Sequence, residues 1–227
     1  MVDAIAMGRK IYSNLKKAIR YIISIHIPII LTVFIPLVLG WLYPNIFTPV
    51  HVIFLEIVMG PTCSIVYENE PIEKNAMTQR PRRYTSTFLN GKELTVSIIQ
   101  GLAITAATLL MYQFAVQQHL SEALTRTLVF LTLISANVWL SLVNRSFYYS
   151  FIETFRYKNP LMPAVIVVTV AMVTALLTVR PLVDFFQFEQ PTLSQVAIAF
   201  VAGFASVAWF EIVKGIRRIR DRVVRTP

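Results

Sequence analysis

The chain has 227 residues, of which 56% are hydrophobic and 15% are charged, and its formal net charge is +9. So few charged side chains cannot cover a water-soluble surface, and the composition therefore excludes a soluble globular domain and indicates an integral membrane protein. The single cysteine, Cys63, excludes an intrachain disulfide bond.

Apolar runs define the predicted elements. A hydrocarbon core about 30 Å thick needs roughly 20 apolar residues per helical span, and the residue alternation of a barrel strand is missing. We therefore predict an all-α integral membrane bundle of six transmembrane helices, because helices satisfy their own backbone groups in lipid. In chain order the spans are expected at about 21–43, 47–67, 94–117, 127–143, 161–180 and 193–213, with a stalk helix at 1–20 and a basic tail at 214–227.

The basic residues predict the topology. All of the 21 Lys and Arg residues except Arg126 and Arg180 fall in the N-terminal arm, the second-to-third and fourth-to-fifth connections, or the tail. We therefore expect a multi-pass protein with both termini in the cytoplasm, in the plasma membrane. This distribution also explains the positive charge by contact with membrane lipid, with no nucleic acid partner. On the stalk, Lys16, Lys17 and Arg20 are expected to face solvent or headgroups.

The first span contains a histidine and a proline. Pro28 lacks an N–H and frees the carbonyl of Ser24. His26 can coordinate a soft metal or relay a proton, or it can be an uncharged histidine that is hydrogen-bonded inside the bundle. Near the outer end, Trp41 and His51 fit an aromatic belt.

The second span contains Glu56, the one acid near the centre of any span. An ionised carboxylate there is costly unless it faces a partner, an ion or water, so we expect a role in cation passage. The structural alternative is a protonated side chain that is hydrogen-bonded to a neighbouring helix. Gly60 shares a helix face with Glu56, and Pro61 frees the carbonyl of Ile57 as a possible cation ligand. A kink that serves only packing is the alternative for Gly60 and Pro61.

The fourth span contains Asn137 in its middle. This residue is either a cation ligand or a side chain that hydrogen-bonds to a neighbouring helix. The candidate metal ligands are therefore Glu56, His26 and Asn137. With one anion on the path, a monovalent ion or a proton fits better than two divalent ions. At the end of the last span, Glu211 is expected to pair with Lys214 or Arg218.

Several short motifs resemble the fifth to tenth membrane helices of P-type cation-transporting ATPases, the relatives of calcium and sodium pumps. The stalk and first span carry Gly8, Arg9, Ile11, Tyr12, Asn14, Lys16, Ile19, Arg20, Tyr21 and Ser24 at the family's spacing. Glu70-Pro71, Met77 and Pro81-Arg82 follow the second span, Asn144-Arg145-Ser146 follows the fourth, and Phe210-Glu211-Ile212-Val213-Lys214 ends the last. The resemblance covers nearly the whole chain.

The resemblance also implies roles for single residues. Glu56 falls at the family's first polar ion ligand on the sixth helix, and Asn137 aligns with a carboxylate ligand of calcium pumps. His26 stands where sodium-pump relatives carry an Asn ligand. Gly60 replaces an Asp of strong divalent sites, and Ile29 replaces a Glu, so the expected charge of the site is reduced.

The family hydrolyses ATP through an aspartyl-phosphate in an Asp-Lys-Thr-Gly-Thr motif, with Mg²⁺ and a nucleotide-binding domain, and this sequence lacks the motif. We therefore expect a truncated or split portion of a pump that supplies part of the cation path. It is not an ATPase alone and has no cofactor of its own, because Mg²⁺ and ATP would bind the missing domains. Its expected partners are the transported cation and either the N-terminal part of the pump or a second copy. The alternative is an independent six-helix channel, carrier or regulatory subunit.

Overall fold

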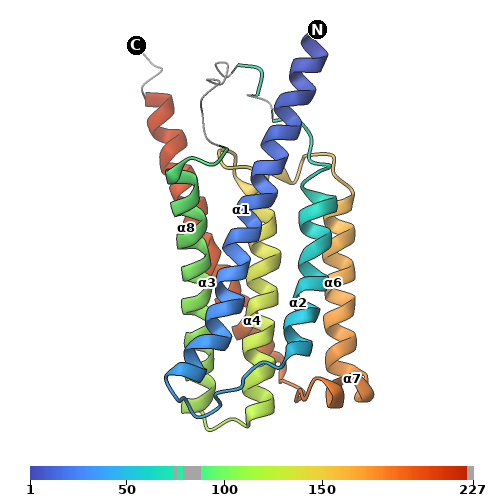
Figure 1. Ribbon diagram of the computed structural model, residues 1–227, viewed down its shortest axis with the longest axis vertical. Coiled ribbons are helices and arrows are strands. Elements are labelled where there is room, and N and C mark those ends of the chain that lie inside the picture. The colour runs from blue at the N-terminus through green and yellow to red at the C-terminus, as the bar shows by residue number, and fades with distance from the viewer. Residues whose placement is uncertain (74–75, 79–87, 224–227) are drawn as a thin grey trace.

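The computed structural model describes residues 1–73, 76–78 and 88–223, and all regular secondary structure in these residues is helical (Figure 1). The elements are α1 (Val2–Val38), α2 (Pro49–Pro61), the π-helix η1 (Thr62–Val66), α3 (Gly91–Gln117), α4 (Glu122–Val143), α5 (Phe151–Thr154), α6 (Leu161–Thr178), α7 (Arg180–Phe185) and α8 (Leu193–Val223). Six helical segments, with η1 completing α2, are long and apolar enough to cross a membrane. The predicted all-α bundle with six spans is confirmed.

The stalk and the first span form one continuous helix, α1. Its 37 residues extend about 55 Å at 1.5 Å per residue, which exceeds the thickness of a hydrocarbon core. Figure 1 shows α1 and α8 projecting past the other helices at the end that carries both chain termini, which we call the terminal end. At its opposite end α1 ends at Val38, and the φ of 60° at Gly40 lets Trp41 N donate to the Pro36 carbonyl at 3.0 Å.

Helix α4 lies at the centre of the bundle and is the most buried of the six spans. It packs against α3 and α8, while α1 packs against α3. Glycines permit close contact at two of these interfaces. A Cβ atom at Gly101 of α3 would lie 2.8 Å from the Ser24 carbonyl oxygen of α1, and one at Gly203 of α8 would lie 2.6 Å from the Ser135 side chain of α4.

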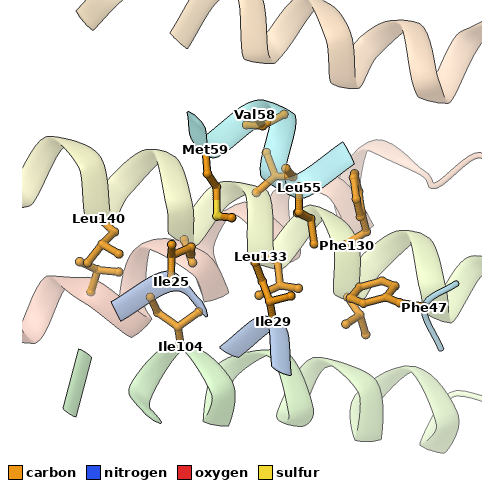
Figure 2. Close-up of a cluster of buried hydrophobic side chains, with 14 of the residues drawn as sticks. Ile25, Ile29, Phe47, Leu55, Val58, Met59, Ile104, Phe130, Leu133 and Leu140 are labelled. Carbon is orange, nitrogen blue, oxygen red and sulfur yellow. The ribbon is translucent and has the colours of Figure 1, made fainter. Parts of the chain in front are cut away.

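The apolar core sets the rotation of α2. Figure 2 shows Leu55 and Met59 of α2 turned toward Ile25 and Ile29 of α1 and Leu133 of α4, while Val58, which is also buried, lines a small cavity with residues of α4 and α6. Within a membrane such contacts stabilise the bundle through van der Waals packing, because lipid is as apolar as these side chains. Because residues one and two positions away point elsewhere on a helix, Glu56, Ile57 and Gly60 lie on the uncovered face of α2.

The end opposite the termini contains a histidine that the sequence placed at the membrane interface. His51 is buried instead, with its ring among Phe47, Phe130 and Phe188. Its Nε2 lies 2.9 Å from the Phe186 carbonyl oxygen, which matches a donated hydrogen bond. The predicted belt position of His51 is therefore wrong, because its two nitrogens find partners within the fold.

At the terminal end, the expectation that Lys17 and Arg20 face solvent is also wrong. Both side chains are buried, with Lys17 Nζ 2.8 Å from Glu73 Oε1, whereas Lys16 remains partly exposed beside Glu93. Glu211 pairs with Lys214 at 2.7 Å, as predicted. The motif residues Pro81 and Arg82 lie outside the described residues.

Candidate cation site

Glu56 and His26 meet across the contact between α2 and α1. Glu56 Oε1 lies 3.2 Å from His26 Nε2, and the two side chains are 47% and 42% exposed in this chain. Each residue lies within a helix that contains a proline close by, Pro28 in α1 and Pro61 in α2. The structure thus brings together two of the three predicted metal ligands.

The contacts of His26 show where hydrogens can lie in the pair. His26 Nδ1 lies 2.8 Å from the Ile22 carbonyl oxygen, so Nδ1 must carry a hydrogen. The 3.2 Å between Nε2 and Glu56 Oε1 can be bridged by one further hydrogen, carried either by an imidazolium or by a neutral carboxylic acid. In both arrangements the pair is neutral overall and keeps one exchangeable proton between the two side chains.

The pair lies on an exposed stripe that is otherwise apolar. On α2 this stripe continues through Ile53 and Ile57 to Gly60, and on α1 through Ile22 and Ile30. These positions recur at helical spacing, opposite the buried face that packs in the core. The predicted path residues Ile57 and Gly60 therefore share the surface on which Glu56 lies.

The other predicted residues of the first span lie elsewhere. Ser24 and Pro28 are buried, and the Ser24 hydroxyl lies 2.8 Å from the Arg20 carbonyl oxygen and 3.3 Å from Gln100 Oε1. The Ser24 carbonyl that Pro28 frees packs closely against Gly101 of α3. These atoms support the contact between α1 and α3, on the side of α1 that faces α3.

Asn137 forms a separate polar contact in the interior. Its Oδ1 accepts a hydrogen bond from the Tyr21 hydroxyl, which joins α4 to α1. Asn137 also lines a cavity of about 10 Å³, together with Thr62 and Ser141. A cavity of this size and polarity can hold about one water molecule. Among the described residues no group of three or more His, Cys, Asp and Glu side chains could hold a metal ion, and the role of Asn137 as a ligand stays a prediction.

Pro61 is followed directly by a change of helix type. The α-helix ends there and the π-helix η1 begins at Thr62, where Tyr67 N donates to the Thr62 carbonyl at 3.3 Å. The Ser64 hydroxyl donates to the Gly60 carbonyl at 2.8 Å. Single π-turns occur frequently at functional sites, and this one lies on the helix of Glu56.

A buried ionic cluster at the terminal end was missed as a unit by sequence reasoning. Glu70 is fully buried and accepts two hydrogen bonds from Arg145, from Nε at 2.7 Å and from Nη2 at 3.3 Å. Asn159 Nδ2 donates to the same carboxylate at 3.0 Å, and Asn14 Nδ2 donates to the Glu70 carbonyl at 2.8 Å. Glu70 and Arg145 both belong to the motifs quoted above, but their spacing in the sequence gives no sign that they pair.

Comparison with known proteins gives the family. Residues 44–216 match the family model described as cation transporting ATPase, C-terminus. A calcium-transporting ATPase of Listeria monocytogenes is 27% identical over 146 residues, which are 64% of this chain and 16% of that protein. A calcium-transporting ATPase of Plasmodium falciparum is 32% identical over 114 residues, which are 50% of this chain and 9% of that protein.

Similarity extends to nearly the whole chain in another relative. The calcium-transporting ATPase type 2C member 1 of Mus musculus is 21% identical over 225 residues, 98% of this chain and 24% of that protein. The chain thus spans at most about a quarter of the length of these relatives. Nothing in the fold or the comparisons favours an independent channel or carrier. With six membrane-spanning helices and a family match over most of its length, the chain belongs to the C-terminal membrane portion of the P-type cation-transporting ATPases.

Proposed function

We propose that this chain supplies one wall of the cation path of an ATP-driven pump, with Glu56 as the anionic ligand and His26 as its proton-carrying partner. The observation that carries this proposal is the 3.2 Å contact between the two side chains on an otherwise apolar stripe. Ionisable groups within membrane spans are costly and mark ion pathways. Helices interrupted near the middle of the membrane are a recurring feature of transporter sites.

The chemistry of the pair favours exchange of a proton for a cation. When a monovalent cation binds the Glu56 carboxylate, the proton between Glu56 and His26 leaves to water, and the net charge of the site plus its ligand is unchanged. The relatives are named for calcium transport, but a divalent ion usually needs more than one carboxylate. Glu56 is the only acid on the stripe, so a monovalent ion or a proton is the better match to these residues.

The proposal assigns the remaining steps to parts of a pump other than this bundle. ATP hydrolysis and Mg²⁺ binding belong to soluble domains, because phosphoryl transfer needs metal-holding carboxylates in a preorganised site. Helices of the same pump are the partners that cover the Glu56 stripe. Both termini lie on the cytoplasmic side of the plasma membrane, in agreement with the excess of Lys and Arg at the terminal end.

The test is a comparison of two carboxamide substitutions in the complete pump. Glu56→Gln removes the exchangeable charge, and we expect it to lower cation-dependent ATP hydrolysis about tenfold or more. Glu211→Gln is the control, since Glu211 binds Lys214 at the terminal end. Protein amount and thermal unfolding are measured for both variants. Equal losses of activity per folded molecule would remove Glu56 from the transport role.

A further inference from the structure

A buried histidine joins two chain segments at the end of the bundle opposite the termini, which we call the far end. The connections at this end are residues 39–48, 118–121 and 186–192 (Figure 1). His51 lies in the first turn of α2 and is only 1% exposed. It is more than one turn away from Glu56 on the same helix and lies on the buried face, so it does not belong to the candidate cation site.

The hydrogen bonds of His51 fix its ring in the neutral form. Nε2 lies 2.9 Å from the Phe186 carbonyl oxygen, which can only accept, so Nε2 carries a hydrogen. Nδ1 lies 3.2 Å from the Thr48 backbone nitrogen, whose N–H can only donate, and 2.8 Å from the Thr48 hydroxyl. Nδ1 is therefore unprotonated and accepts. A second proton on the ring would point a new N–H at the N–H of Thr48 and break this bond.

These bonds hold the beginning of α2 in place. Thr48 is the N-cap residue of α2, and its reciprocal contact with His51 forms a capping box. Through the Phe186 carbonyl the same ring reaches the connection between α7 and α8. Loss of the neutral ring therefore releases both the first turn of α2 and this connection.

Aromatic side chains exclude water from the ring of His51. The ring centres of Phe47, Phe130 and Phe188 lie 5.5, 6.1 and 5.1 Å from the centre of the imidazole. A neutral imidazole packs among them as one more aromatic ring. An imidazolium would lose its hydration there, which is costly unless a counter-ion replaces the water.

The charged groups around the ring supply no such counter-ion. On α4, Arg126 acts on the ring with a charge of the same sign as an imidazolium, and Glu122 is already paired with Arg126 at 2.6 Å. On the segment after α6, Asp184 and Glu189 are exposed. The connection 39–48 carries no charged side chain. A protonated ring would therefore face a cation and no buried acid among the described residues of the far end.

We propose that His51 is a proton-sensitive latch, which acid on the far-end side of the membrane opens by protonating the ring and so releasing the first turn of α2 from the connection after α7. When this end opens, the ring meets water and behaves as an ordinary histidine, which takes up a proton at about pH 6.5. Because the closed form has no place for this proton, the closed form is favoured above that pH and loses ground as the pH falls below it.

The size of the effect follows from this linkage. Each pH unit below about 6.5 makes proton uptake by the open form tenfold more favourable, so the open population should rise about 30-fold between about pH 7.5 and about pH 5. Helix α2 also carries Glu56, so the latch controls how firmly the helix of the candidate cation site is held. The latch itself rests on the contacts of His51 and not on the proposed cation path.

The test is hydrogen exchange of the full chain in detergent, measured by mass spectrometry at about pH 7.5 and about pH 5 and corrected for the intrinsic effect of pH on exchange. Residues 49–58 and 186–192 of the unmodified protein should exchange about 30-fold faster at the lower pH after this correction. Residues 128–140, in the buried centre of α4, should show no such change.

His51→Gln is the decisive variant, because an amide keeps a donor for the Phe186 carbonyl and an acceptor for Thr48 but takes up no proton in this range. We expect its corrected exchange to be the same at both pH values. His119→Gln is the matched control, since His119 is an exposed histidine in another connection of the far end. This control should keep the full pH response of the unmodified protein.

The unmodified protein provides a test of its own if His51→Gln does not fold. Acid should then loosen residues 49–58 and 186–192 and leave residues 94–104 of α3, nearer the terminal end, protected. An equal pH response in the unmodified protein and in His51→Gln would overturn the proposal. An acid effect of the same size at both ends of the bundle would also overturn it.

Discussion

Replacement of Arg145 by methionine should destabilise the terminal end strongly. Arg145 is 3% exposed and its partner Glu70 is fully buried, so the substitution leaves a carboxylate without its cation in a site that water does not reach. Asn159 Nδ2 at 3.0 Å remains as a neutral side-chain donor to that carboxylate. Removal of one partner of a buried ion pair costs about 3–5 kcal/mol. For a chain of this size, that corresponds to a fall of the unfolding midpoint by roughly 6–20 °C.

The assay is thermal unfolding of the purified chain in detergent, followed by tryptophan fluorescence. Arg218→Met is the control, because Arg218 and Glu153 are 3.4 Å apart with both side chains partly exposed, and such pairs contribute less than about 1 kcal/mol. The double variant Arg145→Met with Glu70→Met should regain much of the loss, since no charge stays buried alone. Equal midpoints for Arg145→Met and Arg218→Met, or no recovery in the double variant, would refute this reasoning.

Two further predictions concern a helix contact and a titration. Gly101→Ala should lower the free energy of unfolding by about 1–3 kcal/mol, because the new Cβ atom would lie 2.8 Å from both the Ile27 Cβ and the Ser24 carbonyl oxygen. The control is Gly215→Ala, whose Cβ atom meets nothing within 4 Å and which should stabilise α8 by up to about 1 kcal/mol. Equal effects of the two substitutions would contradict the close packing. Because Tyr157 has a pKa of about 12 in the fold, above the usual value near 10, the folded state keeps this proton when the unfolded state loses it. Stability from this group should therefore be intact below about pH 10 and be lost as the pH rises toward 12. The difference between the unmodified protein and Tyr157→Phe in denaturant unfolding checks this, and parallel pH profiles would contradict it.

The six spans could be predicted from the sequence, because length and apolar character decide whether a segment crosses a membrane. The sequence does not predict which face of each helix is buried. In α2 both faces are largely apolar, so Ile53 and Ile57 could as well have faced the core as Leu55 and Met59. Only the packing against α1 and α4 selects the buried face. The sequence could name Glu56 and His26 as unusual residues, but their contact depends on this rotation.

The terminal cluster shows a second limit of sequence reasoning. A lysine near a membrane end normally faces solvent or headgroups, and the sequence predicts this for Lys17. Its acid, Glu73, lies 2.8 Å away in the structure but in a connection far along the chain. No local pattern links two such residues, since ion pairs between helix and loop follow no fixed spacing. The same holds for Glu70 and Arg145, which lie on opposite sides of α3 in the sequence.

The exposure of the Glu56 and His26 pair gives the strongest argument about how this bundle works. Their side chains are 47% and 42% exposed, although both lie within spans that are apolar enough for the membrane interior. Contact with lipid at that depth would expose polar atoms to a medium without hydrogen-bonding partners. Few side chains of the bundle cover this face, whereas α4 is almost entirely buried. A surface of this kind is stable only where further helices or water meet the pair, and the proposed cation path supplies both.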